Sequence, residues 1–149
     1  MGVNGFVVVD ASLAVKWLVE EDDSNKAHAI LQSWDVQDIT RIAPYLLPFE
    51  VANVLHRRVV RGDLRVADST RMIAHLLGSR LELHHPPGLH ARALELATQL
   101  KQGAAYDSHY LALAEEFDCE LWTGDRRFYR AAQTVGNIHW LGAWTIPEP

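Results

Sequence analysis

The chain has 149 residues, of which 48% are hydrophobic and 22% charged, and its formal net charge is -5. This length predicts one globular domain over residues 1–149, and the lack of about 18 consecutive apolar residues excludes a membrane-spanning helix. The acidic balance argues against binding nucleic acid through a broad cationic surface, although carboxylates that bind a metal also bring negative charge. Cys119 is the single cysteine, which excludes an internal disulfide and favours a reducing compartment, so we expect a cytoplasmic protein.

Short apolar segments alternate with segments of helical periodicity along the chain. Residues 6–9 form an apolar, β-branched run typical of a buried strand in a parallel sheet, and a helix that Asp10 or Ser12 can cap follows at once. Later strands are predicted at 39–43, 81–83, 120–123 and 138–141. Further helices are predicted at 24–34, 48–60, 66–77, 89–100, 106–117 and in a short segment after Asp125. This alternation predicts an α/β fold in which helices cover both faces of a parallel sheet.

Two aspartates follow predicted strands. Asp10 comes directly after the strand at 6–9, and Asp125 comes after the strand at 120–123, with Gly124 between them. The carboxyl ends of parallel strands share one edge of a sheet, and ligand sites collect at that edge. Both carboxylates are therefore expected at the same edge.

Two further acids lie on predicted helices. Glu50 falls at the margin of an apolar arc that contains Leu47 and Val51, so its side chain is expected to be half buried. Asp107 opens its helix in line with Leu111 on the inward face. Both acids are therefore expected to face the body of the protein.

Four carboxylates in one place need a neutralising partner. Burying one unpaired carboxylate costs on the order of several kcal/mol, and like charges add to that cost unless protons or a cation neutralise them. Mg²⁺ and Mn²⁺ prefer oxygen ligands, whereas zinc favours cysteine and histidine. Such an ion activates water for attack on a phosphodiester. The pattern therefore predicts a metal-dependent nuclease with four metal-binding and catalytic residues: Asp10, Glu50, Asp107 and Asp125.

Each acid also has a structural interpretation. Asp10 and Asp107 stand where helix N-caps occur, Glu50 can pair with Arg57 on the same side of its helix, and Asp125 is an ordinary turn residue. The gaps of 40, 57 and 18 residues between the acids match no local metal motif. The convergence of the four acids is thus a hypothesis that rests on their joint placement.

The chain also contains, in this order, the segments VVVDASLAVKWLVEE, PFEVANVL and AAYDSHYLALAEEFDCELWTGDRRF. These segments and their order resemble PIN-domain ribonucleases, in particular the VapC-type toxins of bacterial and archaeal toxin–antitoxin pairs. The resemblance spans nearly the whole chain. It places the acids of the family on the four residues named above, and the small hydroxyl positions of the family on Ser12 and Thr123.

The resemblance implies a three-layer α/β/α fold with a parallel sheet of about five strands. It implies one or two Mg²⁺ or Mn²⁺ ions and an RNA substrate whose phosphodiester bonds are hydrolysed by metal-activated water. It also implies a homodimer and inhibition by a cognate antitoxin, a small DNA-binding protein with a tail that reaches toward the site. Ser12 and Thr123 are candidates to hold metal-bound water, with capping and turn roles as the alternative.

Other side chains are candidates for contacts with a substrate or a partner. The helix that carries Glu50 has a second apolar edge, which we predict to be a partner surface: Leu46, Phe49 and Val60. Three basic side chains are possible contacts for substrate phosphate, with solvated surface charges as the alternative: Lys16, Arg126 and Arg127. His84 and His85 are neighbours on a strand and point to opposite faces, which argues against a shared metal.

Two other functions compete with a nuclease. Phosphoryl transfer through an aspartyl intermediate also uses an Asp after a first strand, but it normally needs a second Asp two residues on, where this chain has Ser12. The other alternative is a non-catalytic PIN-like module that binds RNA or protein and uses its acids only for structure.

Overall fold

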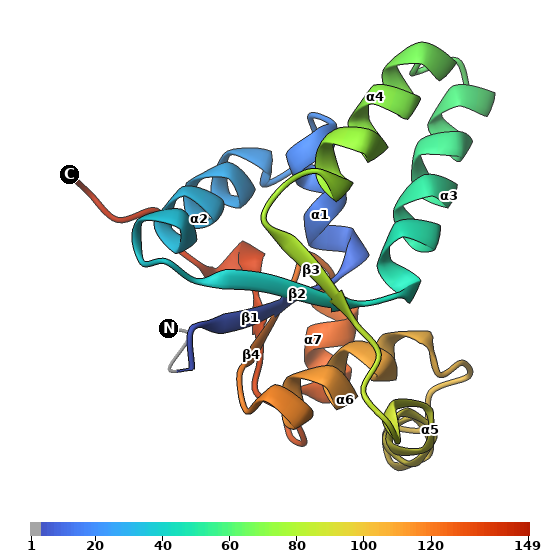
Figure 1. The fold of residues 1–149 in the computed structure, drawn as a ribbon, viewed down its shortest axis with the longest axis vertical. Coiled ribbons are helices and arrows are strands. Elements are labelled where there is room, and N and C mark those ends of the chain that lie inside the picture. The colour runs from blue at the N-terminus through green and yellow to red at the C-terminus, as the bar shows by residue number, and fades with distance from the viewer. Residues whose placement is uncertain (1–3) are drawn as a thin grey trace.

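The chain folds around a five-stranded parallel sheet, drawn in Figure 1. The computed structural model describes residues 4–149. The strands are β1 (Phe6–Val9), β2 (Thr40–Pro44), β3 (Leu81–His84), β4 (Glu120–Thr123) and β5 (Ile138–Trp140). They lie in the order β3–β2–β1–β4–β5, and every neighbouring pair is parallel. The predicted parallel sheet of about five strands is confirmed.

Helices connect the strands. They are α1 (Ala11–Leu18), α2 (Ser24–Val36), α3 (Leu46–Val60), α4 (Val66–Leu77), α5 (Leu89–Gln99), α6 (Tyr106–Phe117) and α7 (Arg126–Ala132), and a 3₁₀ turn (Leu141–Ala143) follows β5. Helix α3 begins two residues before Pro48, which therefore lies in the first turn. Proline is tolerated there because N–H groups of the first turn have no acceptor within the helix.

The two faces of the sheet pack against different helices. Successive side chains of β1 alternate between the faces, as expected of a strand buried on both sides. Val7 and Val9 pack with Ile30 and Trp34 of α2, whereas Val8 belongs to a second apolar cluster formed with α3, α5 and α6. All three valines are completely buried. The three-layer α/β/α arrangement predicted for the chain is therefore confirmed.

The strand order reverses next to β1. From β1 the chain moves outward through β2 to β3, and it then returns to place β4 and β5 on the other side of β1. In open α/β sheets, ligands bind at the carboxyl ends of the strands where the order reverses. Here that point lies between the ends of β1 and β4, which are followed by Asp10 and Gly124.

Helices α3 and α4 form a hairpin that projects from one edge of the sheet (Figure 1). Its apolar residues on the inner side, such as Leu55 and Leu76, reach the core, while Val60 and Val66 near its tip are exposed. Within residues 4–149, no helix combines the length and the apolar character needed to cross a lipid bilayer.

Candidate active site

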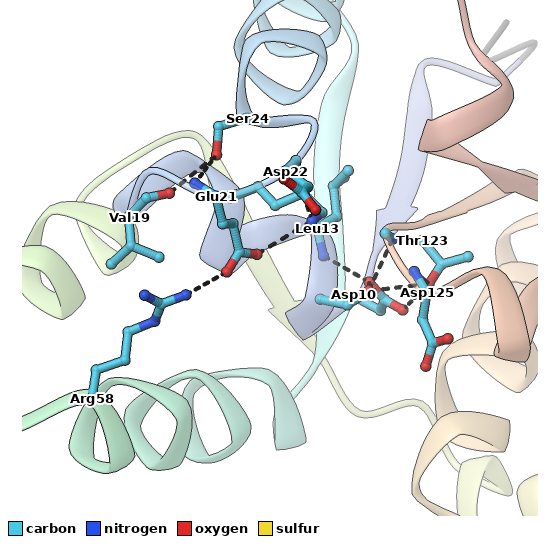
Figure 2. Close-up of polar contacts among 12 residues, drawn as sticks. Asp10, Leu13, Val19, Glu21, Asp22, Ser24, Arg58, Thr123 and Asp125 are labelled. Atoms are coloured by element: carbon cyan, nitrogen blue, oxygen red, sulfur yellow. Dashed lines mark hydrogen bonds and ion pairs between the residues drawn. The ribbon is translucent and has the colours of Figure 1, made fainter. Parts of the chain in front are cut away.

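Asp10 ends β1 and caps α1. Its carboxylate accepts hydrogen bonds from the Leu13 backbone N–H (3.0 Å), Ser12 Oγ (2.7 Å) and Thr123 Oγ1 (2.5 Å); Figure 2 shows Leu13 and Thr123 on either side of it. Only 4% of the residue is exposed. Burial raises the pKa of Asp10 to about 6 although these hydrogen bonds lower it, and the charge of Asp107 adds a smaller rise. The structural interpretation as a helix cap is thus confirmed for Asp10, and Ser12 is not the cap.

The hydroxyl groups of Ser12 and Thr123 connect Asp10 to the loop after β4. Thr123 Oγ1 donates to Asp10 Oδ2 and accepts from the Asp125 backbone N–H (3.0 Å). Ser12 Oγ donates to Asp10 Oδ1 and accepts from the Gly124 N–H (2.9 Å). Each hydroxyl group has one proton, and both protons are donated in hydrogen bonds to the ionised carboxylate of Asp10. The two hydroxyl oxygens, 3.1 Å apart, then touch without a proton between them.

Gly124 lets the end of β4 approach the first turn of α1. A Cβ at this position would lie 2.7 Å from Lys16 Cε and 3.0 Å from the Ser12 carbonyl oxygen. Any larger residue would push the loop that carries Asp125 away from Asp10. The Thr-Gly-Asp sequence therefore sets the distance between these two acids.

Glu50 is half buried on α3, as expected. Its Oε1 accepts a hydrogen bond of 2.6 Å from the Tyr110 hydroxyl of α6. Burial raises the pKa of Glu50, the hydrogen bond from Tyr110 lowers it, and the charge of Asp107 raises it further. Across the described part of the chain, Glu50 forms no ion pair with Arg57, so that interpretation is wrong. Tyr110, three residues after Asp107, was not among the predicted site residues.

Asp107 and Asp125 complete the group. Asp107 lies in the first turn of α6, whose N-cap is Ala105, so the capping interpretation is wrong for Asp107. Burial raises the pKa of Asp107, and the charge of Asp125 raises it further. Asp125 is exposed, and its Oδ1 accepts from the backbone N–H groups of Arg127 (2.8 Å) and Phe128 (3.3 Å). Asp125 therefore caps α7 and also faces the other acids.

The four acids line one open cleft of about 300 Å³. They come from the end of β1, α3, α6 and the residue before α7. Other residues line the same cleft, among them Ser12, Asn53, Arg57 and Tyr110. Asp107 is the central acid, because its charge raises the pKa of both Asp10 and Glu50 and its own pKa is raised by Asp125. The structure brings the four predicted acids together; their metal-binding and catalytic roles stay a prediction.

The donor set fits a hard divalent cation. The cleft offers carboxylate and hydroxyl oxygens, with neither cysteine nor histidine among its lining residues. The mutual repulsion of the acids is what a cation would relieve. In the range 4–149, no three Asp, Glu, His or Cys side chains already stand close enough to hold an ion together, so binding requires side-chain rotation.

Of the residues that the structure describes along this cleft, none is one of the three predicted basic residues, Lys16, Arg126 and Arg127. Lys16 Nζ is 3.3 Å from Glu21 Oε1 and donates to the Asp22 carbonyl oxygen (2.8 Å), so it is engaged at the end of α1. The Arg126 guanidinium lies 5.1 Å from the ring centroid of Trp140. Arg127 is exposed. Their proposed contacts with phosphate stay predictions.

The predicted partner edge of α3 is divided. Phe49 is 75% exposed and Val60 is 72% exposed, whereas Leu46 is partly buried: it packs against the core and also lines the same surface groove as Phe49. Phe49 and Val60 are eleven residues apart, or about 16 Å along the helix. They therefore lie on the same side of α3 but near its opposite ends, and their role as a partner surface stays a prediction.

Cys119, His84 and His85 lie outside the residues that line the acidic cleft. Cys119 is buried, and burial raises the pKa of its thiol to about 11, which leaves it unreactive at neutral pH. His84 contacts Phe117 while its neighbour His85 stacks on Tyr45, so the two histidines do not meet.

The fold, together with the acidic cleft at the switch point of the sheet, indicates the family of proteins to which the chain belongs. Residues 7–133 match the model of the PIN domain, and the chain belongs to the PIN-domain family.

Within this family the chain is similar to proteins named VapC ribonuclease. It is 30% identical to ribonuclease VapC9 of Mycobacterium tuberculosis over 85% of this chain and 91% of that protein. It is 34% identical to ribonuclease VapC3 of Pyrobaculum aerophilum over 81% of this chain and 90% of that protein.

Solved structures share the fold. PAE2754 from Pyrobaculum aerophilum superposes with a TM-score of 0.67 at 22% identity, covering 91% of this chain and 90% of that one. VapC20 of Mycobacterium tuberculosis, described as a toxin that cleaves the sarcin–ricin loop, gives a TM-score of 0.64 at 15% identity, covering 84% and 94%.

Proposed function

We propose that this chain is a Mg²⁺-dependent endoribonuclease, the toxin of a toxin–antitoxin pair that acts in the cytoplasm. The single observation that carries the proposal is the meeting of Asp10, Glu50, Asp107 and Asp125 in one cleft at the switch point of the sheet. The ribonuclease names of relatives at 30% and 34% identity support the substrate class. Mn²⁺ suits the same oxygen donors.

The chain's own residues would prepare the cleft for the ion. Asp10, Asp107 and Asp125 would hold it, with Glu50 at the edge. When bound, a hard divalent cation supplies a water acidified for in-line attack on phosphorus and stabilises the charge on the leaving oxygen. Ser12 and Thr123 fix both oxygens of Asp10, and Tyr110 fixes Glu50. Orienting the ligands in this way limits the rearrangement that binding requires.

RNA cleavage with and without a divalent metal tests this function. The native chain should cut single-stranded RNA in Mg²⁺, and a chelator should stop the cleavage. Glu50→Gln keeps an oxygen that can accept from Tyr110 but loses a charge, so we expect about a tenfold lower rate and a higher Mg²⁺ requirement. Both are measured with a fluorescent RNA, and Mn²⁺ binding by calorimetry should weaken in parallel.

Glu116→Gln is the matched control, because Glu116 is exposed on α6 outside the cleft. It should match the native chain in rate and in metal binding. If the native chain binds RNA but leaves it intact with either metal, the proposal fails in favour of a non-catalytic binding module.

We also propose that the toxin is a homodimer joined through an aromatic face, defined by Tyr45, Phe49 and Tyr106. These side chains are 56%, 75% and 62% exposed and surround a groove of about 370 Å³. Among the described residues that line the groove there is no Asp, Glu, Lys or Arg. A two-fold contact places a patch against its own copy, so a patch that brings no carboxylate, lysine or arginine against itself is suited to it.

We propose that the antitoxin binds at the tip of the α3–α4 hairpin and not at the aromatic face. Val60 and Val66 are 72% and 62% exposed; Val66 lines a groove of about 200 Å³ between these helices, and Val60 follows Val59, which lines it too. An exposed apolar groove between two helices suits an amphipathic segment of a partner protein.

The second prediction separates the two surfaces. Phe49→Ser combined with Tyr106→Ser should convert the dimer into a monomer in sedimentation analysis, since both side chains are exposed and contribute little to the core. Val60→Ser should leave the dimer intact. A native chain that sediments as a monomer, or a dimer lost through Val60→Ser, contradicts this assignment.

A further inference from the structure

Most cations of this chain are neutralised by carboxylates. Residues 4–149 contain all 14 lysine and arginine side chains, and nine of them lie within 4.0 Å of a carboxylate oxygen. In this part of the chain, the cations without such a partner are Arg57, Lys101, Arg126, Arg127 and Arg130. Three of these five follow Asp125 on α7. The unpaired positive charge is thus concentrated near the acidic cleft.

Arg57 is the one member of this group that lines the cleft itself. It follows Glu50 by seven residues, which places it on the same side of α3 and about 10 Å farther along the helix. Its neighbour Arg58 turns the other way, where Figure 2 shows it directed at Glu21, with Nη2 2.6 Å from Glu21 Oε2. The two adjacent arginines therefore have different surroundings, and Arg58 joins α3 to the loop between α1 and α2.

Arg57 does not serve to neutralise the acids. A guanidinium that balanced Glu50 would lie within ion-pair distance, but Glu50 takes its hydrogen bond from Tyr110 instead. Within residues 4–149 no ion pair or side-chain hydrogen bond engages the Arg57 guanidinium, so its N–H donors stay available in a planar fork that matches two oxygens of a phosphate. Arg126 and Arg127 follow Asp125 directly in the chain, but among the described residues Arg57 is the cation that lines the cleft.

We propose that Arg57 binds a backbone phosphate of the RNA strand adjacent to the phosphate that is cut. The strand would cross the cleft from α3 toward α7. This inference rests on the ribonuclease function proposed above. Phosphate contacts fix the position of a strand without reading its sequence, so the contribution of Arg57 is the same for RNAs of different sequence.

Binding and cleavage are measured separately in the full chain. Binding of a labelled single-stranded RNA is followed by fluorescence anisotropy between 50 and 200 mM salt, in an Asp10→Asn background in which the RNA stays intact. Arg57→Gln should weaken binding about three- to tenfold and reduce the slope of log K against log salt by about 0.7, the value for one phosphate of a single strand. In cleavage assays it should raise KM and leave kcat nearly unchanged.

Two variants control this test. Arg61→Gln removes a nearby exposed arginine that pairs with Asp63, and it should change neither affinity nor slope. Arg57→Lys keeps the charge and should restore the native slope. The inference is overturned if Arg57→Gln equals Arg61→Gln in both measurements, or if it lowers kcat with binding unchanged, because Arg57 would then act on the acids. If the native chain also fails to cut RNA, the proposed function is overturned as well. If the native chain cuts RNA, only the proposed role of Arg57 is overturned.

Discussion

Asp10→Asn should abolish RNA cleavage and at the same time stabilise the metal-free protein at neutral pH. Changing a group that merely orients a metal ligand typically costs ten- to hundredfold, so loss of Asp10 itself should lower the cleavage rate by more than about a hundredfold. The stabilisation arises because Asp10 is almost completely buried beside Asp107, and its ionised form is costly without a cation. An asparagine side chain removes that charge and still accepts from the Leu13 N–H.

The sign of the pH dependence follows from the raised pKa. Asp10 titrates at about 6 in the folded chain, against an ordinary value of 3.8. Its stabilising contribution is complete below pH 3.8 and is lost as the pH rises through 6. Each pKa unit corresponds to about 1.4 kcal/mol, so the metal-free native chain should lose on the order of 2 to 3 kcal/mol of unfolding free energy relative to Asp10→Asn between about pH 4 and 7.

Denaturant unfolding at several pH values, in the presence of a chelator, measures this difference. Glu116→Gln, outside the cleft, should show no such trend relative to the native chain. Added Mg²⁺ should stabilise the native chain at pH 7.5 and have little effect on Asp10→Asn. A stability difference between Asp10→Asn and the native chain that stays constant with pH would contradict the assignment of a costly buried charge to Asp10.

The sheet could be predicted from sequence because its central strands leave a simple pattern. Residues 6–9 are a short apolar run, and Leu121 and Trp122 give residues 120–123 an apolar centre; both strands have these bounds in the structure. The start of α3 was less predictable, because Tyr45 precedes it without a side-chain cap and Pro48 resembles a beginning. Helix ends without caps carry no local signal, and tertiary packing then decides where they lie.

The candidate site could likewise be predicted only in part from the sequence. Asp10 could be placed from its strand, whereas the partner of Glu50 could not, because local spacing favoured Arg57 and the fold supplied Tyr110 from 60 residues away. The ring of Tyr110 is buried in the core, as an apolar helix position suggests, and only its hydroxyl reaches the cleft. Periodicity identifies the face on which such a side chain lies but not the polar atom that it meets.

Thr123→Val should damage stability and cleavage together, although it exchanges only a hydroxyl for a methyl group of similar size. Thr123 is completely buried, and its Oγ1 holds Asp10 Oδ2 while accepting the Asp125 N–H. Valine leaves that N–H without its acceptor and removes a donor from the Asp10 carboxylate. An unsatisfied buried group costs about 1 to 3 kcal/mol, so we expect a loss of that size in unfolding free energy.

Cleavage should fall because Thr123 joins two acids that come from different strands. Without the hydroxyl, Asp10 and the loop that carries Asp125 lose their common anchor, and the rate in Mg²⁺ should drop about ten- to hundredfold, as for other groups that orient metal ligands. Thr123→Ser retains the hydroxyl and should keep most of the activity, with a smaller loss of stability from the missing methyl group. The rates of the two variants, measured below their unfolding temperatures, decide the matter: equal rates for valine and serine would show that the hydroxyl has no part in positioning the acids.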